Sequence, residues 1–511
     1  MYRTMADKGG TWFDGAGAIS GSQPGKPPAS VLTAPGARSR RTWIVLIAAA
    51  ALATCSAIAL ATIPVEWTWE VLRILGVVLL LMGAFYFPVD APKPAFVIWW
   101  VMLIGECIFF REGDADSSAR AYAGAFPTAA YGEAIVWILC LLAVLLCSFR
   151  VRGFFRELFR GDYKWNTFFA LMCIVSCAYA PRFSLGAVWA FKIMLVVLLL
   201  GACSARMRNF QDTISFLRVS IWAYAIIVLQ PVIIAALRGE MFDEEGRMST
   251  IVSPNALSPN AAIMLLMALA IFSKRKGEGM DRWAVVLGLV GLVVMVLAGS
   301  KTGVLACVFA GTIFFILRGR LGTAFTYIAG TAALASVLVL STPLGDYLHL
   351  YQDRAGAESF SGRTILWSAV IPEIKNKPIV GHGYMASEFV MFQVNAVGWA
   401  APHLHNGFLE SLYNTGFIGF AFLVMILFVI PKNLIGVLRR VPKDEYLYRV
   451  AAGCFALYAF LLINGFFNSS YGGKCTAPFM LLLALVIVSQ KLLALAPVPG
   501  PSPVVTAKRL P

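Results

Sequence analysis

The sequence predicts an all-α polytopic membrane protein with about 14 transmembrane helices, within a range of about 12 to 14. The first observation is composition: 59% of the 511 residues are hydrophobic and only 14% are charged, whereas an ordinary soluble domain is roughly a quarter charged. The second is a series of apolar segments near the length of about 20 residues that lets a helix cross the hydrocarbon. The third is the alternation of basic residues between the intervening loops.

The apolar segments account for most of the chain. They are 43–63, 69–87, 95–110, 132–149, 165–180, 185–203, 214–237, 256–273, 282–298, 301–317, 322–341, 406–430, 449–468 and 476–496. They predict five regions: a disordered cytoplasmic tail, an N-terminal transmembrane bundle, a large loop, C-terminal transmembrane helices and a second cytoplasmic tail. These regions are residues 1–42, 43–341, 342–405, 406–496 and 497–511. The first tail is rich in glycine, proline and serine, so it cannot bury enough apolar surface to fold.

Basic residues indicate which side of the membrane each loop occupies, because lysine and arginine in short loops are retained in the cytoplasm. The loops after even-numbered spans carry Arg150, Arg152, Arg156, Arg160, Lys164, Arg206, Arg208, Lys274, Arg275, Lys276, Arg318, Arg320, Lys432, Arg439, Arg440 and Lys443. The other loops are poorer in basic residues and include the acidic runs 111–116 and 240–246. This alternation places the loop 342–405 outside. It also explains the net charge of +15 without a nucleic-acid partner.

The large loop 342–405 contains all four histidines of the protein, His349, His382, His403 and His405. Histidine is the side chain that titrates near neutral pH, so this concentration favours a reaction site over simple avoidance of lipid. Within the loop, residues 361–384 have the apolar spacing of an amphipathic helix that ends at the glycines of GHG. We expect this helix to lie along the membrane surface.

Three groups of residues in this part of the chain have the spacing of a family signature. His405 and Asn406 are followed by nine residues and then Gly416, and after two more intervening residues by Gly419. The other two groups are Gly362–Arg363 with Trp367, Pro378, Gly381 and Gly383, and Arg247 with Pro254–Asn255. Together they resemble the O-antigen ligase and Wzy-type polysaccharide polymerase family, with an exopolysaccharide polymerase-like character.

The resemblance implies a multi-pass enzyme of the bacterial inner membrane whose active site faces the periplasm. Such enzymes transfer a glycan from a polyprenyl-diphosphate carrier, such as undecaprenyl diphosphate, to an acceptor hydroxyl. A polymerase extends exopolysaccharide or O-antigen repeat units, whereas a ligase of lipopolysaccharide biosynthesis passes the finished glycan to lipid A core. The motifs common to both do not separate these reactions, and we favour the polymerase. Polysaccharide export machinery is an expected partner, besides membrane lipids.

Residue chemistry supports the same roles. The forked guanidinium groups of Arg247 and Arg363 suit diphosphate oxygens. Lys301 stands where the family commonly has an arginine, so it keeps the charge but loses the fork. His405, with an ordinary pKa of about 6.5, could take the proton of the acceptor hydroxyl, and activity should then rise with pH through that value. Direct displacement would invert the anomeric centre.

Several alternatives remain open at the level of single residues. The two arginines could instead lie among lipid headgroups. His403 could compete with His405 as the base. Asn406 could either orient the histidine or cap the following helix.

We expect no cofactor and no metal ion, since the outer carboxylate pair Asp114 and Asp116 is an isolated D-x-D. We also interpret the apolar-segment cysteines as small hydrophobic residues. The rival from another class is a lipid-linked oligosaccharide transporter or flippase. Lys192 and Arg218, which lie within predicted spans, favour that rival.

Overall fold

The computed structural model describes residues 94–108, 137–145, 154–238, 241–242, 248, 253–271, 282–341, 363–388 and 404–497. In this part of the chain the structure is almost entirely helical, and its β-structure is a single bridge between Phe242 and Met248. The predicted spans 43–63 and 69–87, the first tail and nearly all of the second tail lie outside the described residues. So do most of the loop 342–405 and the residues Arg247, His349 and His403.

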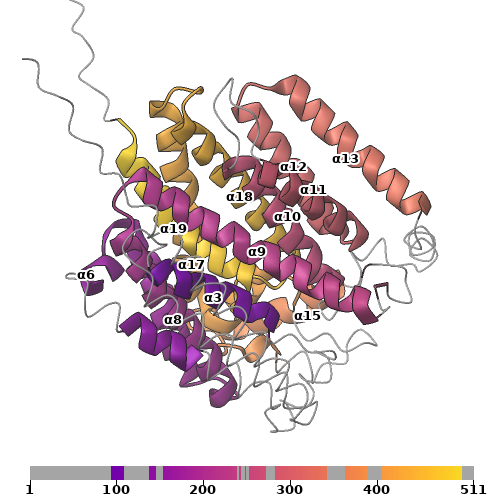
Figure 1. Cartoon of the computed structure of the whole chain (residues 1–511). Helices are drawn as coiled ribbons and strands as arrows, with labels where there is room; N and C mark the ends of the chain where they lie inside the picture. Colours follow the sequence, from indigo (N-terminus) through magenta and orange to yellow (C-terminus); the bar gives the residue numbers. More distant parts are fainter. Residues whose placement is uncertain are drawn as a thin grey trace, which may run out of the picture. The chain divides into compact units, whose positions relative to one another are not determined.

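The described helices follow the predicted spans closely (Figure 1). They are α3 (Pro94–Ile108), α6 (Phe154–Leu158), η1 (Gly161–Tyr163), α7 (Lys164–Cys177), α8 (Phe183–Arg206), α9 (Phe210–Arg238), α10 (Pro254–Ile271), α11 (Arg282–Leu297), α12 (Lys301–Leu317), α13 (Leu321–Ser341), α15 (Arg363–Asn376), α17 (Gly407–Arg440), α18 (Tyr446–Phe467) and α19 (Ala477–Leu495). Residues 137–145 are also helical.

Six of these helices, α8, α9, α10, α17, α18 and α19, are long and apolar enough to cross a membrane. Shorter apolar stretches occur in α3, α11, α12 and α13. The prediction of an all-α, multi-pass membrane protein is therefore confirmed for the described residues. Within 361–384 the predicted helix is present as α15, which covers Arg363–Asn376, whereas α17 continues ten residues beyond the predicted span 406–430.

One end of the helices gathers the predicted cytoplasmic loops. The Tyr446 hydroxyl at the start of α18 donates to the carbonyl of Ile271 at the end of α10 over 2.6 Å. Its ring also meets Phe210, the first residue of α9. The Tyr448 hydroxyl donates to the carbonyl of Leu317, the last residue of α12, over 2.8 Å. At or near this end lie the basic residues Arg206, Arg208, Arg318, Arg320, Arg439 and Arg440.

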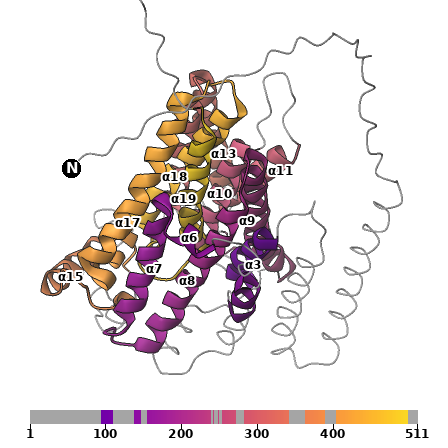
Figure 2. The same cartoon turned by 90° about the vertical axis from the view of Figure 1, so that its left-hand side faces the viewer.

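The opposite end gathers α15 and the starts of α8, α10, α12, α17 and α19. The Gly407 amide, which begins α17, donates to the carbonyl of Asn468, just after α18, over 3.0 Å. The Tyr179 hydroxyl, between α7 and α8, donates to the carbonyl of Val380 over 2.6 Å. Figure 2 shows α17, α18 and α19 running side by side with α15 at one end of α17. The large loop and the basic loops therefore meet the helices at opposite ends.

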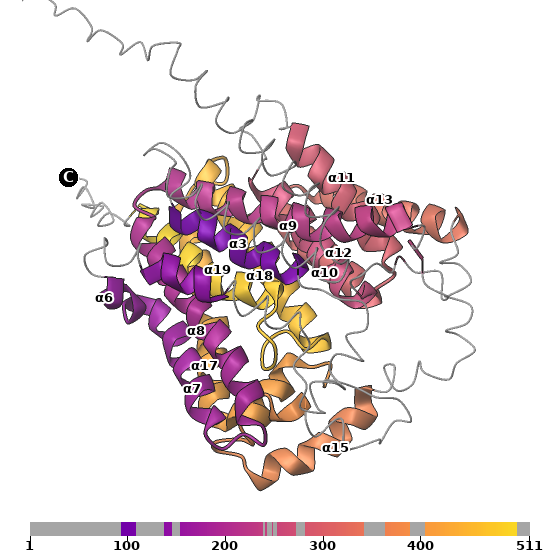
Figure 3. The ribbon, with the colours of Figure 1, turned by 60° about the horizontal axis from the view of Figure 1, so that its bottom comes forward.

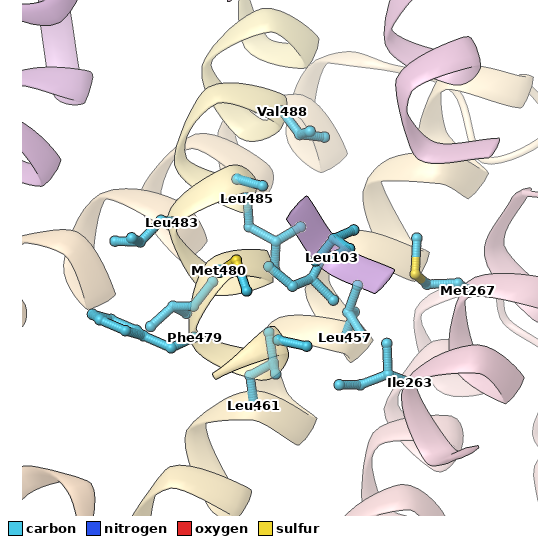
Figure 4. Close-up of a cluster of buried hydrophobic side chains, with 14 of the residues drawn as sticks. Leu103, Ile263, Met267, Leu457, Leu461, Phe479, Met480, Leu483, Leu485 and Val488 are labelled. Atoms are coloured by element: carbon cyan, nitrogen blue, oxygen red, sulfur yellow. The ribbon is translucent and has the colours of Figure 1, made fainter. Parts of the chain in front are cut away.

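The core that fixes this arrangement is apolar and comes from helices distant in sequence. Figure 4 shows side chains of α3, α10, α18 and α19 meeting in one buried cluster, among them Leu103, Met267, Leu457 and Phe479. Helix α10 is buried on nearly all sides. It contains many small residues, and such residues allow helices to approach closely where lipid supplies no hydrophobic driving force.

Helix α17 consists of two helical segments joined at Gly416, where the backbone has φ 63° and ψ −169°. Such a break frees main-chain groups that need other partners. The segment 378–383 supplies them: the His382 amide donates to the Tyr413 carbonyl over 2.9 Å, and the Phe417 amide donates to the Pro378 carbonyl over 2.8 Å. The segment after α15 is thus hydrogen-bonded into the break of α17.

Glycine is required where these two backbones touch. A Cβ on Gly416 would overlap the carbonyl of Ile379, and a Cβ on Gly381 would lie 2.5 Å from the Gly416 nitrogen. Both glycines also have positive φ, a conformation that other residues adopt only at a cost. From sequence alone, a glycine in an apolar span is interpreted as part of a small-residue packing face. The place of Gly416 at a helix break corrects that interpretation, because its main role is conformational.

We predict that Gly416→Ala lowers the thermal unfolding midpoint of the protein in lipid nanodiscs. The substitution adds a strained backbone conformation, which costs about 1–3 kcal/mol, and a steric overlap with Ile379. The matched control is Gly330→Ala in α13, where a Cβ meets nothing within 4 Å and helix propensity improves by about 0.5–1 kcal/mol. An unfolding midpoint at or above wild type for Gly416→Ala would contradict this account.

Candidate active site

The candidate site is built around the three residues that precede α17. Asn406 is the N-cap of this helix, and its side-chain oxygen accepts hydrogen bonds from the amides of Phe408 and Leu409 over 3.0 and 3.1 Å. Of the two roles left open for Asn406, the structure shows capping. Because the cap fixes where the helix begins, it also fixes the position of His405, the residue immediately before it.

His405 has a left-handed backbone conformation with φ 51°, which is uncommon for a residue with a Cβ and is found at strained functional positions. Its amide donates to the Ser469 hydroxyl over 3.0 Å. The neighbouring Leu404 is fully buried, and its amide donates to the Glu410 carboxylate over 3.0 Å. The turn that presents His405 is therefore held by side chains of α17 and of the loop after α18.

Helix α15 brings an arginine to this turn. Arg363 is its first described residue and Trp367 lies one turn further on, so both face the same side. The Trp367 indole donates to the Leu404 carbonyl over 3.0 Å. Leu366 and Val370 are buried with Leu404 in a small apolar cluster that joins α15 to the start of α17. Figure 3 shows α15 beside this end of α17.

Burial and the neighbouring charge of Arg363 shift the titration of His405. Burial is the larger cause, and together with the positive charge of Arg363 it lowers the pKa of His405 to about 4. Both causes disfavour the charged imidazolium. The pKa of His405 in the ligand-free protein therefore lies below the ordinary histidine value of about 6.5. The ring is neutral, and able to accept a proton, across the physiological range.

The other predicted residues are more scattered. Lys301 is exposed at the first residue of α12. It lies at the same end of the helices as His405, because the first turn of α12 packs against Ser258 of α10. Arg247 and His403 fall outside the described residues. His382 stacks on Tyr413 with ring centroids 4.3 Å apart, and burial lowers its pKa, so we find no reason to assign it a catalytic role.

Sequence analysis missed two polar side chains of this site, Glu410 and Ser469. Glu410 is buried in the first turns of α17, a helix long and apolar enough to cross a membrane. A charged residue inside a predicted span is a signal that could have identified it. Ser469 has no comparable signal, because it lies in a polar connection between two helices.

The described residues contain no group of three or more histidine, cysteine or acidic side chains that could hold a metal ion. Asp114 and Asp116, the carboxylate pair singled out from sequence, lie outside them. Seven of the ten cysteines are buried in the described segments: Cys140, Cys173, Cys177, Cys203, Cys307, Cys454 and Cys475.

The site lies in a chain with several helices long and apolar enough to cross a membrane, and comparison with known proteins finds similarity over part of that chain. Residues 283–424 match the family model described as "O-Antigen ligase". This segment includes α15, His405, Asn406 and both glycines of the signature. The resemblance predicted from the motifs is confirmed by this match.

Two curated proteins are similar to parts of the chain. The exopolysaccharide production protein ExoQ of Rhizobium meliloti (strain 1021) is 32% identical over 95 residues, which cover 17% of this chain and 21% of that protein. A Rickettsia conorii protein described as a "putative polysaccharide ligase" is 21% identical over 280 residues, which cover 52% of this chain and 66% of the relative. The chain thus spans less than two thirds of the length of either relative.

We predict that the His405 ring titrates near pH 4 in the ligand-free protein. The measurement is the histidine 13Cε1 chemical shift in a variant that retains only His405, followed from pH 3 to 8 in nanodiscs. Arg363→Gln should raise the pKa of His405, because it removes a repelling positive charge from the imidazolium.

Lys377→Gln is the matched control for this titration. Lys377 lowers the pKa of His382 and is not among the causes that act on His405. A midpoint near 6.5 in the wild type, or equal shifts in Arg363→Gln and Lys377→Gln, would contradict the interpretation.

Proposed function

We propose that this protein is a membrane glycosyltransferase of the bacterial inner membrane. It transfers a glycan from a polyprenyl-diphosphate carrier to an acceptor hydroxyl at the periplasmic face, and polymerises exopolysaccharide or O-antigen repeat units. The observation that carries the proposal is the placement of Arg363 beside His405, at the end of the helices opposite the basic loops. The match to the O-antigen ligase family model supports it.

The proposed topology follows from the charges at the helix ends. Because basic loops are retained in the cytoplasm, the end that carries Arg206, Arg318 and Arg440 faces inward. His405 and Arg363 then face the periplasm. We propose about 14 helices in all, with the five regions expected from sequence: tails 1–42 and 497–511, helical regions 43–341 and 406–496, and a periplasmic loop 342–405.

Arg363 is proposed to hold the diphosphate. The leaving group carries two negative charges, and the planar fork of an arginine can bind two phosphate oxygens at once. The same charge stabilises the diphosphate as its bond to the sugar breaks. Arg247 is proposed to share this role, and Lys301 to add a point charge at the same end of the helices. Arginines thereby supply the charge stabilisation that a metal ion provides in other transferases, so we propose a metal-independent reaction.

His405 is proposed to be the general base. The acceptor oxygen attacks the anomeric carbon while the carbon–oxygen bond to the diphosphate breaks. The acceptor proton passes to the neutral imidazole, and the polyprenyl diphosphate leaves with the bonding electrons. A single displacement of this kind inverts the anomeric centre. A bound diphosphate would offset the charge of Arg363 and raise the pKa of His405 in the complex, which makes it a stronger base.

The ligase reaction, with lipid A core as acceptor, is the alternative within the same chemistry. It is favoured by the descriptions "O-Antigen ligase" for the family and "polysaccharide ligase" for the Rickettsia relative, whereas the Rhizobium relative is described by exopolysaccharide production. A deletion strain distinguishes the two. Single repeat units on the carrier indicate a polymerase, and intact polymer with bare lipid A core indicates a ligase. Polysaccharide export machinery is the proposed partner of the polymerase.

A lipid-linked oligosaccharide transporter is less well supported. Such a protein places ionisable residues near the middle of the bilayer. Lys192 is buried, but its ammonium lies 5.0 and 4.8 Å from the ring centroids of Trp137 and Trp189, a contact that accounts for its burial. Arg218 is exposed and acts electrostatically on Tyr446, at the end with the basic loops.

The first test concerns the diphosphate. We predict that Arg363→Ala weakens binding of a polyprenyl-diphosphate glycan and reduces transfer at least about tenfold, as expected for losing a charge-assisted contact worth about 1.5–3 kcal/mol. Arg363→Lys should restore little of the binding and transfer, because a point charge cannot replace the forked guanidinium. Binding and turnover are measured with purified protein in nanodiscs, and Lys375→Ala in the same helix is the control. Full activity in Arg363→Ala would remove this residue from the diphosphate site.

The second test concerns the base. We predict that His405→Ala leaves donor binding nearly intact while transfer falls by at least about a hundredfold, the lower bound of typical acid–base contributions. His403→Ala should reduce transfer less than His405→Ala does. The assay contains a chelator throughout. Retained turnover in His405→Ala, or strict dependence on an added metal ion, would move the chemistry elsewhere.

A further inference from the structure

The turn that carries His405 is tethered to one buried carboxylate. The Leu404 amide donates to Oε1 of Glu410 over 3.0 Å. The His405 amide donates to the hydroxyl of Ser469 over 3.0 Å, and the side chain of Ser469 in turn interacts with Glu410. Two successive amides before α17 are thus held, directly and through one serine, by the same side chain.

Helix capping does not explain why a carboxylate is buried at position 410. Asn406 already caps α17 through the amides of Phe408 and Leu409. Glu410 is 1% exposed, and its second oxygen, Oε2, has no hydrogen-bond partner among the described residues. A buried carboxylate is costly unless its contacts compensate. The contacts that it does make lead to the backbone of Leu404 and to Ser469.

The His405 backbone needs such a tether. Its left-handed φ of 51° is unfavourable for a residue with a Cβ and persists only where surrounding contacts over-determine it. On the other side of the turn, the Leu404 carbonyl accepts from the Trp367 indole of α15. The backbone of Leu404 is therefore hydrogen-bonded on both sides, with its carbonyl bonded to Trp367 of α15 and its amide to Glu410 of α17.

We propose that Glu410 is a positioning residue for the base. By holding the amides of Leu404 and, through Ser469, of His405, it fixes the imidazole relative to Arg363 and to the acceptor hydroxyl. This proposal rests on the proposed function, in which His405 is the general base. Small displacements of a reacting group slow a reaction strongly, since a misplacement of about 1 Å can lower the rate about a hundredfold.

A double-mutant cycle separates positioning from general damage to the fold. Wild type, Glu410→Ala, His405→Ala and the double variant are compared in single-turnover transfer and donor binding in nanodiscs. We expect Glu410→Ala to reduce transfer by about ten- to a hundredfold at unchanged donor affinity, because Arg363 lies on a different helix. In the His405→Ala background the same change should cost less than about twofold, because its effect passes through His405.

Glu410→Gln and Ser469→Ala keep the proposal testable if Glu410→Ala fails to fold. The glutamine oxygen can still accept from the Leu404 amide, so Glu410→Gln should retain transfer within about threefold of wild type, with an unchanged pH profile. Ser469→Ala should slow transfer only where His405 is present. Ser411→Ala is the matched control, since Ser411 is the next residue of α17, is buried, and its hydroxyl has no hydrogen-bond partner among the described residues.

The outcomes distinguish the positioning role of Glu410 from the proposed function of the protein. High turnover in His405→Ala overturns the proposed function itself. An inactive His405→Ala together with equal losses from Glu410→Ala in both backgrounds overturns the positioning role alone. So does a loss in Ser411→Ala as large as that in Glu410→Ala, or a shifted pH profile in Glu410→Gln, which would indicate that Glu410 acts through its charge.

Discussion

The hydrogen bonds between segment 378–383 and the break in α17 at Gly416 are the constraint on which the site depends. A continuous helix would satisfy its own amides and carbonyls and leave no main-chain groups to receive another segment. The break exposes those main-chain groups, and the segment after α15 forms hydrogen bonds with them. Since Arg363 begins α15 and His405 precedes α17, this main-chain pairing helps to hold the two residues at the same end of the helices.

The electrostatic character of the site follows from the same arrangement. Burial of the turn and the nearby guanidinium of Arg363 act in the same direction on His405 and keep it neutral. Because a positive group is kept next to a neutral base, the site is suited to an anionic ligand beside a nucleophile that loses a proton. The strained backbone of His405 and this charge pattern support the proposed group transfer rather than transport.

Much of the fold could be predicted from the sequence because apolar length and loop charge are local properties. Helix α15 could be predicted in the same way, from its apolar spacing. The family signature indicated that Arg363 and His405 belong to one site. The break at Gly416 was not accessible, because a glycine in an apolar helix is equally compatible with close packing. The tether from Glu410 to Leu404 and the shifted pKa of His405 depend on tertiary burial, which no sequence pattern specifies.

The low proton affinity of the ligand-free His405 has a kinetic consequence. An acceptor or a water molecule that enters an empty site meets only a weak base. Under the proposed chemistry, the arriving donor brings the negative charge that strengthens the base, so the order of substrate binding becomes part of the chemistry. Productive turnover then favours donor before acceptor, and a polymer chain can dwell near the membrane without being activated prematurely.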